Sequence, residues 1–217
     1  MDEGESIMSK AVWKPTTLLG PIPPVLVSCG TVERPNALTI AWTGIVNTHP
    51  PMTYVSVRPS RFSYDLIKNS GDFVINLPSV PLTKAVDFCG VRSGKDMDKL
   101  SLMGLTVSPS QFVSAPLIEE CPVNLECKVT QILPLGSHEM FLAEILAVHV
   151  EEHLIDASGK LHLERANLIG FSHGEYYQLG PKTGTFGFSV RKKTKKHGQR
   201  KNNSINQKTR EQKGRKA

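Results

Sequence analysis

Short apolar runs rich in β-branched residues recur along the chain and predict a β-rich fold. We expect strands at 25–32, 38–46, 52–57, 73–77, 123–130, 141–150 and 168–171. Turn residues such as those in 34–36 and the Pro50-Pro51 pair separate them. The run Val123–Thr130 alternates apolar and polar side chains, which is the period of a strand with one buried face. Six or seven short strands at this spacing are typical of a barrel or a sandwich.

Three segments have helical character instead. Ser63–Asn69 begins with a candidate capping residue, Ser63, followed by an early acid. Leu82–Cys89 places apolar residues three and four positions apart, and Asp96–Met103 is a third helical segment. No polar or Pro/Gly-rich linker interrupts this pattern. We therefore predict one β-rich domain at 11–190, after a loose N-terminus at 1–10 and before a separate tail at 191–217.

The tail holds most of the excess positive charge. Of the 26 Lys and Arg residues, twelve lie between Arg191 and Ala217, with one of the 20 acids. The first 190 residues therefore carry 14 bases against 19 acids. The tail has one large aliphatic residue, Ile205, so it buries too little apolar surface to offset its ordering entropy. We predict a disordered basic tail, which either binds a polyanion such as nucleic acid or is a solvated appendage.

Several function classes lack their sequence features. No apolar run reaches the ~18 residues of a membrane helix, and the acidic N-terminus does not resemble a signal peptide. P-loop, dinucleotide and serine-hydrolase motifs are absent from the sequence. Four cysteines, scattered in apolar surroundings, fit neither a disulfide framework nor a four-cysteine zinc site. We therefore expect a cytoplasmic protein without membrane insertion.

One match to a zinc motif is misleading. Residues 149–153 read H-x-x-E-H, but the preceding run is rich in β-branched residues and predicts a strand. Residues four apart on a strand are about 13 Å apart, too far to share one metal ion. We expect no metal site.

The stretch 35–64 carries the chemistry of a candidate binding site. Small or hydroxylated residues within 38–46 let a flat ligand approach the backbone. Two guanidiniums, Arg58 and Arg61, lie with three serines just before a predicted helix, a combination that suits a phosphate. The glycine-rich loop at 88–96, with Arg92 and Lys95, suits an anion as well. An ordinary strand pair and a flexible loop with surface arginines explain the same residues, and this alternative stays open.

The order of these segments resembles the flavin reductase-like family with an FMN-binding split barrel, and within it the flavoredoxin branch. The matching segments are PNALTIAW, NTHPPMTYVSVRPSRFSYDLI, GDFVINLP, CGVRSGKDMDKL, GLTVSPSQFVSAPLIEECPVNLEC and LIGFSHGEYYQLG. The resemblance covers roughly residues 11–182. It implies a mainly β fold, a six-stranded Greek-key split β-barrel with a few short helices, that forms a homodimer with FMN near the subunit interface.

The resemblance also implies a set of FMN-binding residues. Asn36–Trp42 would run along the isoalloxazine, with Asn47 and Thr48 in a neighbouring turn. Ribityl, phosphate and the closing loop would involve Ser56, Arg58, Ser60, Arg61, Phe62, Ser63, Gly90, Ser93, Gly94 and Lys95. His173 and Tyr177 come from a C-terminal stretch near the flavin. The full set is Asn36, Ala37, Leu38, Thr39, Ile40, Ala41, Trp42, Asn47, Thr48, Ser56, Arg58, Ser60, Arg61, Phe62, Ser63, Gly90, Ser93, Gly94, Lys95, His173 and Tyr177.

The chain departs from the family at Trp42, which is bulkier than the serine found there in two-component monooxygenase reductases. This favours a tightly held flavin over an exchanging one. The implied function is an FMN-dependent oxidoreductase with NAD(P)H as the expected donor, and no catalytic acid, base or nucleophile is required. The alternatives are an FMN-holding electron carrier without its own NAD(P)H turnover, and a nucleic-acid-binding protein that acts through its tail.

Overall fold

The computed structural model describes residues 9–191 of the 217-residue chain. The chain divides into two units, the first ending at Pro181 and the second starting at Lys182. The described part of the second unit contains one turn of 3-10 helix, Phe188–Val190. Apart from Arg191, the tail that we predict to be disordered lies outside the described residues, and so does most of the predicted loose N-terminus. The domain boundaries drawn from the sequence stay predictions.

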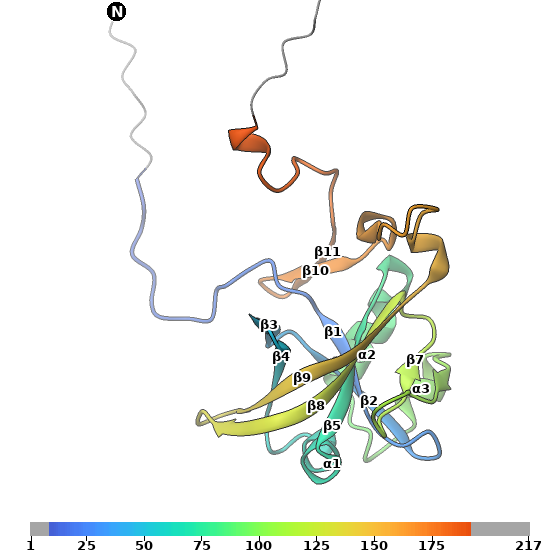
Figure 1. Cartoon of the computed structure of the whole chain (residues 1–217). Helices are drawn as coiled ribbons and strands as arrows, with labels where there is room; N and C mark the ends of the chain where they lie inside the picture. The colour runs from blue at the N-terminus through green and yellow to red at the C-terminus, as the bar shows by residue number, and fades with distance from the viewer. Residues whose placement is uncertain (1–8, 192–217) are drawn as a thin grey trace, which may run out of the picture. The chain divides into compact units, whose positions relative to one another are not determined.

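The first unit is built on one antiparallel sheet of seven strands (Figure 1). In spatial order the strands run β2-β1-β5-β8-β9-β4-β3. Their bounds are β1 Val25–Gly30, β2 Pro35–Ile40, β3 Thr43–Thr48, β4 Pro51–Val57, β5 Asp72–Leu77, β8 Val123–Pro134 and β9 Glu139–Val150. All neighbouring strands are antiparallel. Strands fall in each of the seven segments where the hydrophobic pattern predicts them, with shifted ends.

The sheet closes on itself because its two end strands are consecutive in the sequence. β2 and β3 lie at opposite ends of the strand order, yet only Ala41 and Trp42 separate them along the chain. The sheet must therefore curl until β2 comes near β4, and side chains from both strands share one buried core. No strand pairing joins β2 to β4, so the barrel stays split along this line. The predicted mainly β split barrel is confirmed, and it has six strands if β2 and β3 count as one bent strand.

The continuous strand predicted at 38–46 is therefore wrong. The chain leaves β2 at Ile40 and enters β3 at Thr43. β-Propensity continues through this stretch, but closure of the barrel requires a sharp change of direction there. Trp42 already lies beside β4, since its carbonyl oxygen accepts the Ser56 N–H at 2.9 Å.

Short helices and two small sheets complete the first unit. The α-helices are α1 Phe62–Ser70, α2 Thr83–Val91 and α3 Lys99–Leu102. Turns of 3-10 helix occupy Val80–Leu82, Glu152–Leu154 and Leu163–Arg165. β6 Val107–Ser108 pairs with β7 Leu117–Ile118, and β10 Ile169–Ser172 pairs with β11 Glu175–Gln178. None of the helices in the described part of the chain combines the length and apolarity that a membrane span requires.

Two helix starts differ from the sequence prediction. α1 begins at Phe62, and its N-cap residue Arg61 makes no side-chain capping bond. Ser63 is not the cap: it is buried in the first turn, and its Oγ accepts a hydrogen bond from Asn36 Nδ2 at 2.6 Å. The predicted helix 96–103 shortens to α3, because Asp98 caps it by accepting the Ser101 N–H at 3.1 Å.

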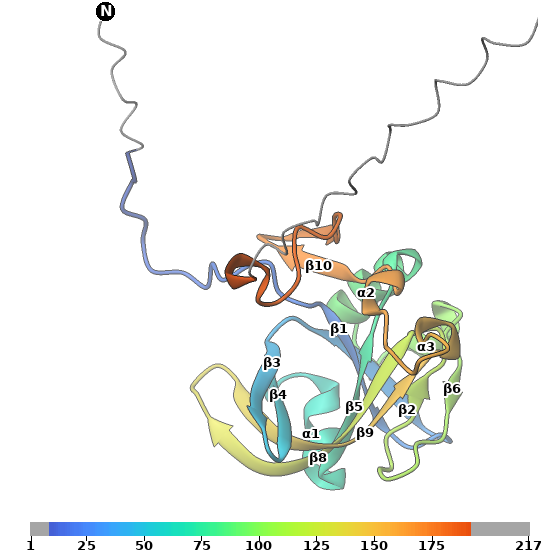
Figure 2. The same cartoon turned by 45° about the horizontal axis from the view of Figure 1, so that its top comes forward.

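The core lies on both sides of β1. Val25 and Val27 point into the barrel, where they meet Ile67 of α1 and Phe73 of β5. Leu26 points the other way, into a second buried cluster formed with α2. Figure 2 shows α2 on the outside of the barrel, well apart from α1. Because β1 is buried on both faces, its sequence reads as a nearly continuous apolar run rather than an alternating one.

Three segments are tied together where β2 begins. Asn36 of β2 donates to Ser63 of α1 at 2.6 Å. The loop after α2 lies directly on Asn36: a Cβ added at Gly94 would be 2.0 Å from Asn36 Oδ1 and 3.2 Å from Phe62 Cδ1. Lys99 of α3 donates to the carbonyl oxygens of Cys89 and Arg92, both at 3.2 Å, near the end of α2. These contacts hold β2, α1 and the loop at 92–98 in one arrangement.

Replacing Gly94 with Ala tests how tightly these segments pack. We expect the free energy of unfolding to fall by about 1–3 kcal/mol, because the added methyl group displaces a buried, hydrogen-bonded Asn36. Urea unfolding of both proteins measures it. Gly180→Ala is the control: nothing lies within 4 Å of its added Cβ, and a change below about 0.5 kcal/mol is expected. Equal stability of the two variants would contradict the packing.

A small polar cluster holds the loop between β9 and β10. His162 Nε2 lies 2.7 Å from Asp156 Oδ2, and its Nδ1 lies 3.0 Å from Glu164 Oε1. These two carboxylates raise the pKa of His162 above its usual value. Hydrogen bonds from Ser158, His162 and Lys160 hold the pKa of Asp156 well below its usual range. Asp156 therefore stays ionised over the pH range in which His162 loses its proton.

The stability that His162 provides depends on pH. Because its folded pKa is raised, the contribution is complete below the unfolded pKa near 6.5 and is lost as the pH rises through the folded value. Urea unfolding of the parent and His162→Gln at about pH 5.5 and about pH 9 measures this. We expect the difference between the two proteins to be larger at the lower pH. A difference that is constant, or that grows with pH, would refute the ionic contribution.

Candidate functional site

A large groove follows the split in the barrel, between β2 and β4. Its volume is about 810 Å³. The last residues of β2 and the link to β3 line one side, and the end of β4 with Arg58 directly after it lines another. The N-terminal segment 16–20, His138 of the β8–β9 hairpin and the turn between β10 and β11 complete the lining. β2 pairs only with β1 in the sheet, so the N–H and C=O groups along its other edge are available to a ligand.

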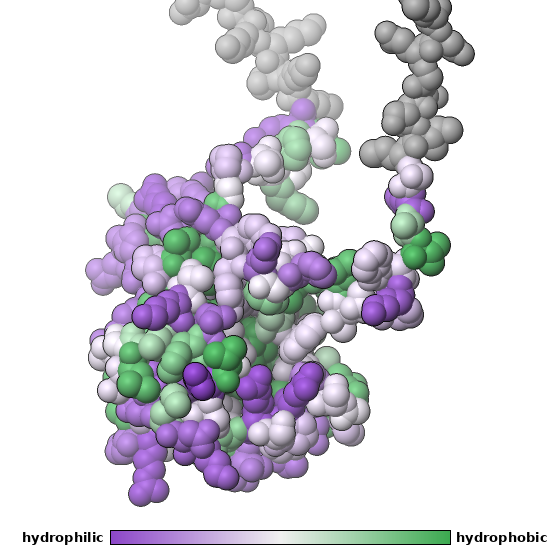
Figure 3. All heavy atoms as spheres, turned by 180° about the vertical axis from the view of Figure 1, so that it is seen from behind, coloured by the Kyte–Doolittle hydropathy of each residue, from purple (hydrophilic) through white to green (hydrophobic). Residues whose placement is uncertain are grey.

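Aromatic side chains and positive charge characterise this groove. Trp42, Phe171 and Tyr176 contribute flat apolar surface. Arg58, Arg61 and two histidines contribute basic groups, and none of the lining residues is an Asp or Glu. Figure 3, the view from behind, shows that hydrophobic residues also lie exposed among hydrophilic ones on that face. A planar molecule with a negative charge suits the lining of the groove.

A second, smaller pocket of about 90 Å³ adjoins the start of α1. Hydroxyl groups and cations line it: Ser60, Arg61, Ser63, Arg92, Ser93 and Lys99, beside Gly94, Leu38, Phe62 and Cys89. Arg61 and Leu38 line both the groove and the pocket. The two hollows therefore meet at these residues, and one elongated ligand can occupy both.

Lys99 is the most unusual residue of the small pocket. It is 4% exposed, and no carboxylate of the described residues forms an ion pair with it. Burial lowers the pKa of its ammonium group, and the charge of Arg61 acts in the same direction. Two of its three donors reach the carbonyl oxygens of Cys89 and Arg92. The remaining donor and the uncompensated charge suit an anion in this pocket.

Many of the residues expected from the sequence come together here. The groove contains Leu38, Thr39, Ile40, Ala41, Trp42, Ser56, Arg58, Arg61 and His173. The small pocket contains Leu38, Ser60, Arg61, Phe62, Ser63, Ser93 and Gly94. These residues come from β2, β4, α1 and two loops, and closure of the barrel brings them together.

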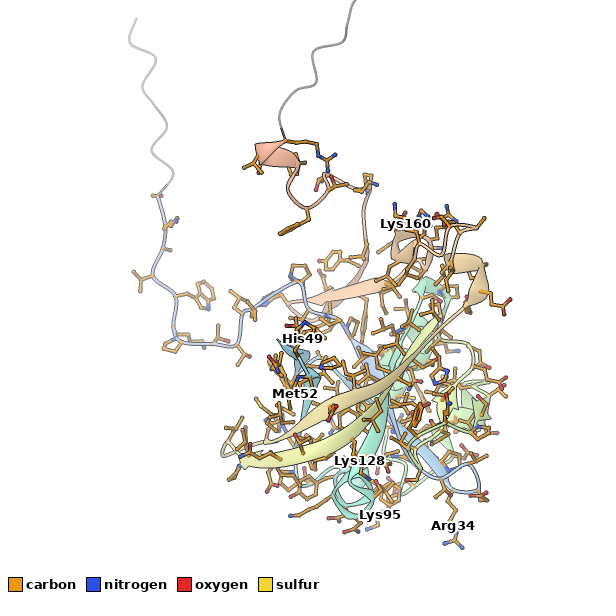
Figure 4. The ribbon with its side chains drawn as sticks, in the orientation of Figure 1. Arg34, His49, Met52, Lys95, Lys128 and Lys160 are labelled. Atoms are coloured by element: carbon orange, nitrogen blue, oxygen red, sulfur yellow. The ribbon has the colours of Figure 1, made fainter. Side chains whose placement is uncertain are left out.

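Seven expected residues line neither hollow. Asn36 and Gly90 position lining residues instead. Asn36 donates a hydrogen bond to Ser63. Gly90 leaves room for Thr39, because a Cβ added at Gly90 would lie 3.3 Å from Thr39 Cβ. Ala37 is buried in the cluster with α2. Asn47 and Thr48 are exposed at the end of β3, beside the turn that His49 marks in Figure 4, well apart from Lys95. Lys95 and Tyr177 are exposed too, and Tyr177 hydrogen-bonds Glu175.

Other residues of the site are missing from the sequence prediction. In the small pocket this is Lys99, while Cys89 and Arg92 belong to the glycine-rich loop at 88–96 that the sequence indicates but not to the expected FMN-binding set. In the groove they are Thr16, Thr17, Leu18, Leu19, Gly20, Ile22, Pro24, Val57, His138, Phe171, Ser172, Gly174 and Tyr176. Tyr176 takes the place expected for Tyr177, because the two alternate across β11. The remaining groove residues come from the N-terminal segment, the end of β4, the β8–β9 hairpin and the β10–β11 hairpin, and their meeting depends on the whole fold.

His138 and Arg58 both line the groove and are hydrogen-bonded to each other. Arg58 Nε donates to His138 Nε2 at 3.4 Å, and Ser137 Oγ lies 2.9 Å from the other ring nitrogen. Burial, together with the charges of Arg58 and Arg61, lowers the pKa of His138. The ring stacks edge-on against Trp42, with centroids 6.1 Å apart. A neutral imidazole therefore accepts the hydrogen bond that orients Arg58.

The H-x-x-E-H histidines have separate partners. His149 lies on β9, and its Nε2 is 2.6 Å from Glu126 Oε1. His153 lies in the next turn of 3-10 helix, 3.1 Å from Glu151 Oε2. Glu126 is fully buried, and this raises its pKa, but hydrogen bonds from Gln111, His149 and Phe112 outweigh the effect and lower the pKa overall. Within 9–191, no cluster of three or more metal-binding side chains is found.

Comparison with known proteins adds independent information. An uncharacterised protein of Pyrococcus abyssi is 32% identical over 159 residues, which cover 73% of this chain and 91% of that protein. The structure of flavoredoxin from Desulfovibrio vulgaris (Miyazaki F) is 30% identical, with a TM-score of 0.79, and covers 84% of this chain and 100% of its own. Flavoredoxin from Methanosarcina acetivorans is 28% identical with a TM-score of 0.76, covering 84% and 100%. The family described as "Flavin reductase like domain" matches residues 20–180, so the chain belongs to the flavin reductase-like family of split-barrel proteins.

Proposed function

We propose that this protein is an FMN-binding flavoprotein oxidoreductase that uses NAD(P)H as its hydride donor. The observation that carries the proposal is the meeting of the two hollows at Arg61. A flat, aromatic-walled groove leads there into a pocket that contains a buried, unneutralised Lys99. A tricyclic ring with a phosphate at the end of a flexible chain matches this combination of shapes and charges.

The residues present suit FMN along its whole length. The free edge of β2 would contact the ring through backbone groups of 38–42, and Trp42 would bound one side. The phosphate would accept hydrogen bonds from the hydroxyl groups of Ser60, Ser63 and Ser93. Arg61 and Lys99 would neutralise its charge. Gly94 leaves the loop close to this pocket. When bound, FMN supplies the hydride and electron transfer, and the chain's part is to hold and orient it.

The lining also favours negative charge on whatever occupies the groove. Arg61 stands where the groove meets the small pocket, and no acid among the lining residues opposes its charge. Fixed positive groups stabilise a ring that gains electrons. No side chain of the chain needs to act as an acid or base for this role.

A homodimer in the cytoplasm is part of the proposal. Ile45 and Val46 of β3 are 69% and 50% exposed, and Trp42, at the start of the same stretch, is 42% exposed. Apolar side chains on an edge strand beside the groove suit a second subunit. The four cysteines are free and buried, which agrees with a reducing compartment.

The alternative is an FMN-holding electron carrier. The 30% identity to a flavoredoxin favours it. Anaerobic mixing of the purified, FMN-loaded protein with NADH or NADPH separates the two functions. Rapid loss of the flavin absorption band is expected for the oxidoreductase. A band that persists would mean that the protein is an electron carrier without its own NAD(P)H turnover. A preparation that is colourless, and stays so after incubation with FMN, would refute both.

The phosphate assignment predicts different roles for two neighbouring lysines. Lys99→Gln should raise the Kd for FMN about 10- to 100-fold, a loss of about 1.4–2.8 kcal/mol, because the buried cation no longer meets the phosphate. Riboflavin, which lacks the phosphate, should bind the variant and the parent within about threefold. Lys95→Gln is the control, since Lys95 is exposed outside the pocket, and it should leave both affinities unchanged.

Fluorescence titration with each flavin measures these constants, and thermal unfolding checks that Lys99→Gln folds. Full FMN affinity in Lys99→Gln would overturn the assignment. So would an equal loss of riboflavin, which would show a general defect of the site.

A further inference from the structure

The structure separates two arginines that are close in the sequence. Arg61 lines both the groove and the small pocket, whereas Arg58 lines the groove alone. The small pocket has two further cations of its own, Arg92 and Lys99. A phosphate in the small pocket therefore has three basic groups around it without Arg58.

Arg58 keeps unused binding capacity. None of the ion pairs in the described part of the chain involves it. Its hydrogen bond to His138 uses Nε, which leaves the four N–H groups of the two terminal nitrogens for another acceptor. The backbone below it is fixed, because its carbonyl oxygen accepts the Arg61 N–H at 2.9 Å and Pro59 follows. The turn fixes the backbone of Arg58, and the hydrogen bond to His138 orients its guanidinium at the groove.

The groove has room for a second molecule. Small-molecule sites span about 300–1,000 Å³, and the groove, at about 810 Å³, lies in the upper part of that range. The N-terminal segment 16–20 and the β10–β11 turn enlarge it beyond the β2 edge. Phe171 and Tyr176 add flat apolar surface there, with ring centroids 5.2 Å apart. A second planar group can therefore lie in the groove beside the first.

We propose that Arg58 forms a second anion subsite, which binds the phosphates of a pyridine dinucleotide while its nicotinamide lies in the groove. This inference rests on the proposed function. It assigns the two arginines to different ligands, Arg61 to the cofactor phosphate and Arg58 to the donor. A guanidinium binds phosphate oxygens through two parallel hydrogen bonds. Arg58 would therefore recognise the geometry of a phosphate in addition to attracting its negative charge.

The test compares Arg58→Gln with Arg34→Gln, both loaded with FMN. Arg34 is an exposed arginine in the β1–β2 turn and lines neither hollow (Figure 4). Two donors are used: NADH, and 1-benzyl-1,4-dihydronicotinamide, which has the same reactive ring but no phosphate. ADP serves as a redox-silent probe, and isothermal titration calorimetry measures its binding.

We expect Arg58→Gln to raise the KM for NADH and the Kd for ADP about tenfold or more. The Kd for FMN and the rate with the phosphate-free donor should stay within about twofold of the parent. Arg34→Gln should match the parent in every measurement. This pattern would also show that Arg58→Gln folds and keeps its flavin.

Four results would overturn the inference. The first is a loss of FMN affinity like that of Lys99→Gln, because Arg58 would then belong to the cofactor phosphate. The second is FMN-loaded parent protein that does not bind ADP, and the third is an equal slowing with both donors. The fourth is ADP binding through Arg58 without reduction by NADH, which would refute a dinucleotide donor. Failure of the proposed function is distinct, since the protein would then take up no FMN or neither donor would reduce it. In the fourth result, the phosphate-free donor still reduces the flavin.

Discussion

Closure of the barrel through two residues is the constraint on which the candidate site depends. β2 and β3 lie at opposite ends of the sheet, and Ala41 and Trp42 alone connect them. The connection pulls β2 toward β4 without pairing their backbones, so the line of closure is a groove rather than a seam of hydrogen bonds. An edge strand in an open sheet invites aggregation. Here the unpaired edge of β2 faces a concave surface, where a ligand can use it.

The sequence carries the positions of the strands but not their closure. Alternation and apolar runs indicate every strand segment of the large sheet, because strands buried on one face alternate and strands buried on both faces, such as β1, are apolar throughout. The break at 41–42 has no local sign, since it follows from how the ends of the sheet meet. The same holds within the site. Lys95 belongs to the glycine-rich loop, yet Lys99 is the lysine that lines the small pocket, because its position on α3 buries its side chain there. Burial of a lysine is a tertiary property that residue type does not predict.

Positive charge in the site is arranged differently from positive charge in the tail. The body of the protein is mildly acidic, yet no acid lines the groove, and the basic residues there come from separate elements: Arg58 and Arg61 after β4, Lys99 on α3 and His138 on a hairpin. Such a local concentration against the net charge attracts an anion to one place. In the tail, the basic residues simply follow one another in the sequence. The anionic ligand is therefore expected at the barrel.

Lys99 connects binding to folding. An ammonium group that is buried without a carboxylate costs free energy in the folded state, and its lowered pKa is a measure of that cost. The two carbonyl oxygens that accept its hydrogen bonds offset part of the cost. An anion in the small pocket would offset more of this cost, so its binding would stabilise the folded state. The chain therefore concentrates its electrostatic strain at the point where the proposed cofactor relieves it.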